Sequence, residues 1–209
     1  MKNNAFDTAR DDLYILLNRG YPKPYALRFV CDHYGLKNEE RYTLSRTVFS
    51  KSYIEGAKEK KVSLKDIKGK ALFIDGYNVI ITTESVLMGK AFVSMDGLLR
   101  DTRNVSGKHR ITKETLESID LILNLLKKYP PKDTQVYLDK MMSKSGKLSQ
   151  IIRDGMEERD LNGDSETVPS VDHTLKKCNG IVATNDSAII AEVAKFIDLP
   201  SKVKTSRGS

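Results

Sequence analysis

Hydrophobic residues in the first part of the chain recur at helical spacing. The earliest set is Phe6, Ala9, Leu13, Leu16 and Leu17. Because these positions fall three or four residues apart, they predict an amphipathic helix over residues 5–18. Pro24 suits the first turn of a second helix, and a third is expected to begin at Asn38 and to run through Val48 as far as Ile54. The N-terminal part is therefore predicted to consist of three short helices.

Lysine dominates residues 58–70, and this stretch is predicted to connect two domains. The hydrophobic pattern changes after it. The continuous apolar run at 71–74 is typical of a strand that is buried on both faces of a parallel sheet, and the mostly apolar runs at 136–138 and 181–184 are predicted as a second and a third strand. These three runs predict the centre of such a sheet.

Helical and polar segments separate the predicted strands. Residues 116–126 and 148–156 have helical patterns, and a final helix is expected over 187–196, ending before Pro200. The polar stretch 162–170 predicts a loop. The alternation of strands and helices favours an α/β fold with a mostly parallel sheet and right-handed crossovers, preceded by a small all-α domain.

The net charge of +7 on this 209-residue chain is concentrated near its start. Residues 1–70 carry 15 Lys+Arg and 9 Asp+Glu, whereas residues 71–209 carry 20 and 19. A basic unit beside a near-neutral one indicates that the first part contacts a polyanion. A solvated basic surface is the alternative.

Several classes of protein are disfavoured by the sequence. No apolar run approaches the roughly 18 residues of a membrane helix. The start, MKNNAFDTARDD, lacks the apolar region of a secretory signal, so a cytoplasmic location away from membranes is expected. The cysteines and histidines are scattered, at Cys31, Cys178, His33, His109 and His173. A zinc-type site built from these residues is therefore not expected.

Aspartates follow the predicted strands. Asp75 and Asp139 each come directly after an apolar run, and Asp186 follows the third run by two residues. Because open α/β sheets bind ligands at the carboxyl ends of their strands, these side chains are expected to converge, with Asp172 facing the same crevice. Clustered carboxylates repel one another and need a cation, and oxygen-only ligands select Mg²⁺ or Mn²⁺. For each aspartate taken singly, a helix N-cap is the alternative.

Two short motifs resemble those of a known superfamily. The segment DGYNVI at 75–80 and the segment TND at 184–186 each follow a predicted strand. Together they resemble the opening and late motifs of the PIN-like ribonuclease superfamily, particularly its NYN branch, over residues 70–200. Residues 1–60, with the segments LNRGYP and ALRFV, resemble the uncharacterised helical domain that precedes such a PIN-like domain in an archaeal family.

The resemblance implies a three-layer α/β/α nuclease domain over 70–200 that cleaves RNA phosphodiesters with a metal ion. By motif position it assigns Asp75, Asp172 and Asp186 to the metal, and it adds Asp139 as a fourth catalytic carboxylate. An Mg²⁺ ion held in this way lowers the pKa of a bound water and orients it in line with the phosphodiester. Whether one or two ions take part stays open.

Further residues are expected to meet the substrate. Asn78 is expected to support the first motif's aspartate or to contact RNA. The superfamily pattern has one more acid between the first strand and its partner, and Glu84, Asp96 and Asp101 all qualify. Asp101 is preferred because Arg100 beside it can bind phosphate. A surface ion pair is the alternative for these two residues.

Two other segments have polar groups suited to an RNA backbone. In KMMSKSGK at 140–147, Ser143, Ser145 and Lys147 precede a predicted helix and can present N–H groups and a cation to phosphate, with a mobile surface loop as the alternative. In the N-terminal part, basic residues alternate with tyrosines, namely Arg19, Lys23, Arg28, Arg41 and Arg46 with Tyr21, Tyr25 and Tyr42. These residues can bind backbone and stack bases, or the tyrosines complete a small core.

The leading hypothesis is a Mg²⁺- or Mn²⁺-dependent endoribonuclease that acts on single-stranded or structured RNA. Its basic helical domain, residues 1–60, is expected to help bind that RNA. The alternatives are a non-catalytic RNA- or DNA-binding module, a DNA-binding regulator that uses the helix–turn–helix-like pair around Gly35, and a structure-specific DNA nuclease. The sequence leaves the cleavage polarity and the oligomeric state open, a homodimer included.

Overall fold

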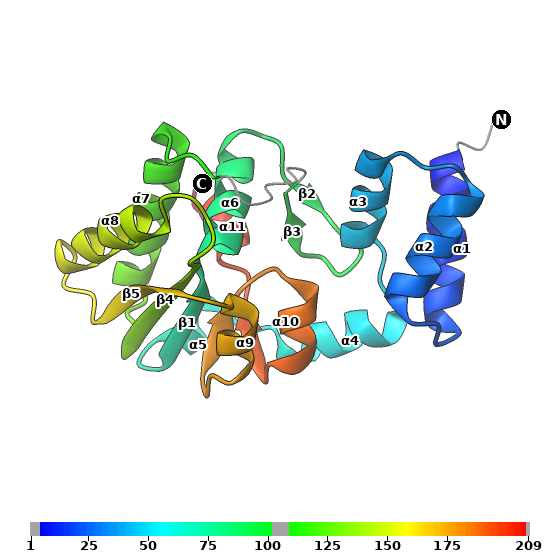
Figure 1. The fold of residues 1–209 in the computed structure, drawn as a ribbon. Coiled ribbons are helices and arrows are strands. Elements are labelled where there is room, and N and C mark those ends of the chain that lie inside the picture. Colours follow the sequence, from blue (N-terminus) through cyan, green and yellow to red (C-terminus); the bar gives the residue numbers. More distant parts are fainter. Residues whose placement is uncertain (1–4, 102–108, 208–209) are drawn as a thin grey trace.

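The computed structural model describes residues 5–101 and 109–207, with side chains described as far as residue 203. The N-terminal part consists of the helices α1 (Ala5–Asn18), α2 (Lys23–His33), α3 (Asn38–Thr47) and α4 (Lys51–Lys60). Figure 1 shows α1 to α3 side by side, with α4 leading from them to the sheet. The apolar stripes of α1 to α3 form a core of their own, which includes Leu13, Val30 and Leu44.

The predicted third helix is in fact two helices. Val48 has an extended conformation (φ −100°, ψ 126°), so α3 ends at Thr47. Ser50 then caps α4, because its side chain accepts a hydrogen bond from the N–H of Tyr53 at 3.2 Å. The prediction of one helix that continues to Ile54 is therefore wrong.

The lysine-rich stretch is folded against the sheet. The N–H of Val62 donates to the carbonyl of Phe196 at 2.8 Å, and a short helix, α5 (Leu64–Ile67), follows. Ile67 is fully buried in the main core. Residues 58–70 are thus part of the fold and not a free connector.

A five-stranded parallel sheet forms the centre of the rest of the described chain. Its strands lie in the order β5 (Gly163–Val168), β4 (Asp133–Asp139), β1 (Ala71–Asp75), β6 (Ile181–Ala183) and β7 (Lys195–Ile197). One face is covered by α6 (Gly76–Leu87), α7 (Lys113–Lys128), α8 (Ser145–Glu157) and α11 (Leu199–Arg207). The other is covered by α9 (Val171–Lys176) and α10 (Ser187–Glu192) together with α4 (Figure 1). The predicted three-layer α/β/α fold with a preceding helical part is confirmed.

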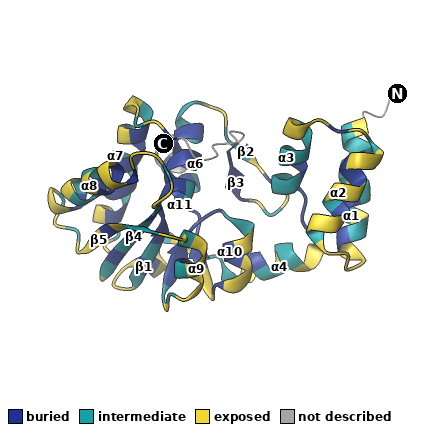
Figure 2. Cartoon of the chain, viewed as in Figure 1, coloured by how far each residue is buried: buried dark blue, intermediate teal, exposed yellow. Residues whose placement is uncertain are grey.

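The core lies where the apolar runs predicted it. In β1, Leu72 and Ile74 are buried, and β1 pairs in parallel with β4 on one side and β6 on the other. Figure 2 shows buried residues along the central strands and exposed residues on the outward sides of α1 and α2. Of the described helices, none is long and apolar enough to cross a membrane.

Residues 162–170 contain strand β5 instead of the predicted loop. Within the described sheet β5 is an edge strand that pairs with β4 alone. Charged residues such as Asp164 and Glu166 therefore stay exposed to solvent, and no charge has to be buried. Gly163 has a φ of 145°, and a Cβ at this position would lie 1.9 Å from the carbonyl oxygen of Thr134. Only glycine therefore allows the two strands to approach here.

The C-terminal segment also differs from the prediction. α10 ends at Glu192, and Phe196, which was expected to end the helix, lies in β7. Pro200 lies in the first turn of α11, where proline is tolerated, and so it begins a helix instead of ending one. Helix α6 and a hairpin of β2 (Phe92–Val93) and β3 (Leu99–Arg100) complete the fold without having been predicted.

Candidate active site

A hollow of about 300 Å³ lies at the carboxyl ends of the central strands, and Asp75, Asp139, Asp172 and Asp186 all line it. These aspartates come from four segments, namely the ends of β1 and β4, the start of α9 and the residue before α10. The strand order reverses at β1, because the chain proceeds to β4 and β5 on one side and to β6 and β7 on the other. Open α/β sheets bind ligands at such a reversal. The four predicted aspartates are therefore brought together at one place.

Asp75 is the most buried of the four. It is 8% exposed, and its Oδ2 accepts a hydrogen bond from the Thr184 hydroxyl at 2.9 Å. The pKa of Asp75 is raised to about 7, chiefly by burial and also by the carboxylates of Asp186 and Asp172, while the Thr184 hydrogen bond acts in the opposite direction. The Asn78 N–H at the start of α6 also lowers this pKa, but burial outweighs it. A capping role alone therefore does not account for this buried carboxylate.

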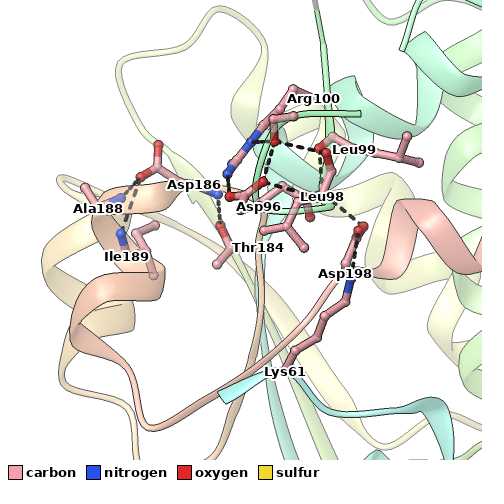
Figure 3. A network of polar contacts seen from close by, with 12 residues as sticks. Lys61, Asp96, Leu98, Leu99, Arg100, Thr184, Asp186, Ala188, Ile189 and Asp198 are labelled. Carbon is pink, nitrogen blue, oxygen red and sulfur yellow. Dashed lines mark hydrogen bonds and ion pairs between the residues drawn. The ribbon is translucent and has the colours of Figure 1, made fainter. Parts of the chain in front are cut away.

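Asp186 does act as an N-cap. Its Oδ1 accepts hydrogen bonds from the N–H groups of Ala188 at 2.7 Å and Ile189 at 3.3 Å, as Figure 3 shows. Both cap bonds end on the same oxygen, so capping does not involve Oδ2. Asp186 therefore combines the structural role with a place in the wall of the hollow.

Asp172 and Asp139 are more open. Asp172 is exposed in the first turn of α9, and partial desolvation raises its pKa, with the carboxylates of Asp186 and Asp139 raising it further against Lys176. Asp139 accepts a hydrogen bond from the Met141 N–H at 2.8 Å, which closes the turn after β4. The four aspartates thus form a chain of mutually repelling carboxylates.

The TND segment holds this part of the site together. The N–H of Asn185 donates to Oδ1 of Asn78 at 2.7 Å. The Asn185 side-chain Nδ2 donates to the Leu99 carbonyl at 2.7 Å and to Oδ1 of Asp198 at 2.9 Å. Asn185 and Asp198 are both fully buried, and Figure 3 shows Leu99 and Asp198 within this network. Asn78 therefore supports the site while also lining the hollow.

Of the three candidates for a further acid, only Asp101 lines the hollow. Glu84 is buried on α6, where its Oε1 accepts from the Thr115 hydroxyl at 2.6 Å and lies 2.9 Å from Nε2 of His109. Asp96 pairs with Arg100 inside the β2–β3 hairpin. The preference for Asp101 agrees with this geometry.

Arg100 is not placed to bind a substrate phosphate. It is 2% exposed, its Nη2 donates to Asp96, and its guanidinium lies over the Phe49 ring at 5.3 Å. The expected role beside Asp101 falls instead to Arg46 on α3, whose Nη2 donates to Oδ2 of Asp101 at 3.1 Å. Arg46 comes from the helical part and lines the hollow. Arg46 and Asp101 are 55 residues apart in the sequence, so no local pattern could have predicted their contact.

The 140–147 segment contributes less than the sequence predicted. Met142 lines the hollow, whereas Ser143, Ser145 and Lys147 are not among its walls. Ser145 is buried as the first residue of α8, while Ser143 and Lys147 are exposed. This segment therefore lies beside the hollow and leaves the two exposed residues to solvent.

The alternating tyrosines and basic residues of the helical part have different surroundings. Tyr21 and Tyr25 are 56% and 75% exposed, so they do not complete the small core, and Tyr42 lines the hollow. Arg41 donates to the carbonyls of Leu36 and Cys31 and thereby holds the turn between α2 and α3. The segment thus has exposed aromatic rings as well as structural arginines.

The donor chemistry of the hollow fits a hard divalent ion. The carboxylates offer oxygen donors, and an ion bound to them would offset both the burial and the mutual repulsion that raise the pKa values of Asp75 and Asp172. Among the described residues, no three or more His, Cys, Asp or Glu side chains form a ready-made metal group. Mg²⁺ commonly uses one or two carboxylates, substrate phosphate and several waters. Asp75 and Asp186 supply that number of ligands.

Comparison with known proteins finds relatives of unknown function. A family profile for a domain of unknown function, DUF5616, matches residues 64–202, and one for a protein of unknown function, DUF434, matches residues 5–60. The chain is 40% identical over 195 residues to the uncharacterized protein MJ0935 of Methanocaldococcus jannaschii, across 92% of this chain and 93% of that protein. No solved structure matches it. The resemblance to the PIN-like superfamily stays a prediction.

Proposed function

For a chain that belongs to the DUF5616 family, we propose a metal-dependent ribonuclease that hydrolyses internal phosphodiester bonds of RNA. The observation that carries the proposal is the meeting of Asp75, Asp139, Asp172 and Asp186 in one hollow at the strand reversal. Helix capping accounts for one of these four residues, Asp186, whose Oδ2 takes no part in it. A bound cation that neutralises clustered carboxylates would explain why all four aspartates meet in this hollow.

In this proposal Asp75 and Asp186 would hold Mg²⁺ or Mn²⁺ with Asp172 as a third carboxylate of the same hollow, and waters and an RNA phosphate would complete the ligands. The bound ion supplies an activated water and neutralises charge that develops on the leaving oxygen. Thr184 keeps Oδ2 of Asp75 oriented through its 2.9 Å hydrogen bond. Asp139 also lines the hollow, and in this proposal it accepts a proton or positions a water.

The helical part supports RNA as the substrate because it reaches into the same hollow. Arg46 lines the hollow with Tyr42, and its Nε is buried without a partner in the described chain. A guanidinium held by Asp101 on one side has N–H groups left for a phosphate on the other. Arg46 is therefore the proposed phosphate contact, in place of Arg100.

The test is cleavage of single-stranded and structured RNA by the purified chain with Mg²⁺, Mn²⁺ or EDTA. We expect the Asp75→Asn/Asp186→Asn double variant to lose cleavage and to bind Mn²⁺ at least tenfold more weakly in calorimetry. An Asp154→Asn/Glu157→Gln variant removes two exposed carboxylates from α8 and serves as the control with the same change of charge. Cleavage that persists in the first variant, or that resists EDTA, would refute the proposal.

A non-catalytic RNA- or DNA-binding module is the second candidate. The observation that favours it is that the described carboxylates form no ready-made metal group. It predicts salt-sensitive binding to RNA that survives the Asp75→Asn/Asp186→Asn change, with no cleavage in any metal. For either function we propose a cytoplasmic location, and light scattering decides between a monomer and a homodimer.

A further inference from the structure

The ammonium group of Lys23 is buried at the junction between the helical part and the sheet. Lys23 is the first residue of α2, and its Nζ lies 3.6 Å from the centre of the Phe49 ring. In the described part of the chain this Nζ has no hydrogen-bond partner. Arg100 lies over the same Phe49 ring at 5.3 Å. The ring therefore has two cations against it, of which only Arg100 has a carboxylate partner, Asp96.

A buried ammonium without a partner is unfavourable, and the cation–π contact with Phe49 offsets only part of the cost. The pKa of Lys23 is lowered to about 7, chiefly by burial and also by the charges of Arg100 and Arg46. The carboxylates of Asp96 and Asp186 act in the opposite direction. Of the three cations in this region, Arg46 pairs with Asp101 and Arg100 with Asp96, whereas Lys23 is left without an anion.

A cavity of about 340 Å³ lies at the same junction, and Lys23 is one of its lining residues. Lys23 and Ser187 line it together with the rings of Tyr21, Phe49 and Tyr53. Tyr21 is 56% exposed, which places a ring partly open to solvent at this cavity. The walls of the cavity therefore bring together Lys23, whose buried ammonium has no partner among the described residues, a hydroxyl group and aromatic faces. A cation, a hydroxyl and aromatic rings are the groups that bind one phosphate and one base of a single strand.

This cavity is a neighbour of the hollow. Asp186 lines the hollow, and the next residue in the chain, Ser187, lines the cavity. Figure 3 shows Asp186 at the start of α10, close to the Arg100–Asp96 pair. A strand bound with one phosphate in the hollow can therefore pass over the start of α10 into the cavity.

We propose that this cavity is a second phosphate subsite, in which Lys23 binds the phosphodiester next to the one in the hollow and Tyr21 stacks on the adjoining base. This inference rests on the proposed function for the identity of the strand, RNA. A base that is paired in a duplex cannot stack on Tyr21, so the subsite selects single-stranded RNA at this position.

The test measures binding of a fluorescent single-stranded RNA oligonucleotide in EDTA, which keeps the strand intact. Lys23→Met is expected to weaken binding about tenfold and to reduce the slope of log K against log salt by about 0.7, the value for one phosphate on a single strand. The control is Lys51→Met, which removes an exposed lysine of α4 whose side chain is 75% exposed. It is expected to change affinity less than twofold.

Proton linkage gives a second readout. Because the pKa of Lys23 is lowered to about 7 in the free protein, binding to a phosphate at pH 8 is expected to add a proton to its amine. Calorimetry in two buffers with different ionisation enthalpies should therefore show uptake of nearly one proton by the wild type and none by Lys23→Met. A Tyr21→Ala variant, changed at a half-exposed position, should fold normally and should also bind the strand several-fold more weakly.

Unchanged affinity and salt slope in both Lys23→Met and Tyr21→Ala would overturn the subsite. Stabilisation of the wild type by inorganic phosphate, with RNA affinity unchanged in Lys23→Met, would also overturn it, since the cavity would then hold a free anion. If no metal supports cleavage but the binding losses are as stated, the proposed nuclease function fails and the subsite stands. If cleavage is confirmed but the binding losses are absent, the nuclease function stands and the subsite fails.

Discussion

Asn185 offers the sharpest test of how the site is built. Its Nδ2 donates to the Leu99 carbonyl on β3 and to the Asp198 carboxylate before α11, at 2.7 and 2.9 Å. In Asn185→Ala both acceptors lose this donor inside the protein. Asp198 is fully buried and keeps the Ser201 N–H at 3.1 Å, with Lys61 at 3.8 Å.

The expected cost follows from these two bonds. Loss of a donor to a buried acceptor costs about 1–3 kcal/mol, and more when the acceptor is charged, so we expect about 4 kcal/mol for Asn185→Ala. For a chain of this length each kcal/mol lowers the melting temperature by about 2–4 °C. A fall of about 8–16 °C is therefore expected.

The assay is thermal unfolding followed by circular dichroism, with urea unfolding as a second measure. The control is Asn124→Ala, because Asn124 also makes two side-chain hydrogen bonds, to Asp120 and from Arg159, but is exposed on α7. Its cost should stay below about 0.5 kcal/mol. If Asn185→Ala lowers the melting temperature no more than Asn124→Ala, the network does not hold the hairpin and the reasoning is refuted.

Two further outcomes are expected. In EDTA the raised pKa of Asp75 means that the folded state binds a proton at this carboxyl more tightly than the unfolded state does. The protonated carboxyl therefore contributes its full stability below about pH 4, and this contribution is lost as the pH rises through about 7. In urea unfolding between about pH 5 and 8, Asp75→Asn should flatten this decline of the unfolding free energy. Arg100→Met leaves Asp96 charged and unpaired in the hairpin, so it should lower the unfolding free energy by about 3–5 kcal/mol, and equal stability would show that this ion pair is not structural.

Much of the sheet was readable from the sequence because its central strands are apolar on both faces. β1, β4 and β6 have that pattern, and the aspartates at their ends meet because the topology places parallel strand ends together. β5 was missed because an edge strand tolerates Asp164 and Glu166. β7 was missed because three residues give too short a pattern to separate it from the end of a helix.

The parts of the site that the sequence did not predict depend on packing between distant segments. The burial of Arg100 depends on Phe49 and on the turn that brings Asp96 to it. The contact of Arg46 with Asp101 exists only because α3 lies beside the β2–β3 hairpin, where the Met95 N–H also donates to the Thr47 carbonyl. The sequence pattern of neither segment indicates this packing. Only the structure could therefore show that Arg46, and not Arg100, lies in the hollow beside Asp101.

The packing of α4 against the sheet domain limits which sequence changes are tolerated between the two parts of the chain. Ala57 and Tyr53 of α4 pack with Ile190 and Phe196, and Val62 bonds to the Phe196 carbonyl a few residues later. The matches to the two family profiles end at residue 60 and begin at residue 64, inside this shared packing. An insertion there would pull α4 from α10 and expose apolar surface, so the joint tolerates substitution far better than a change of length.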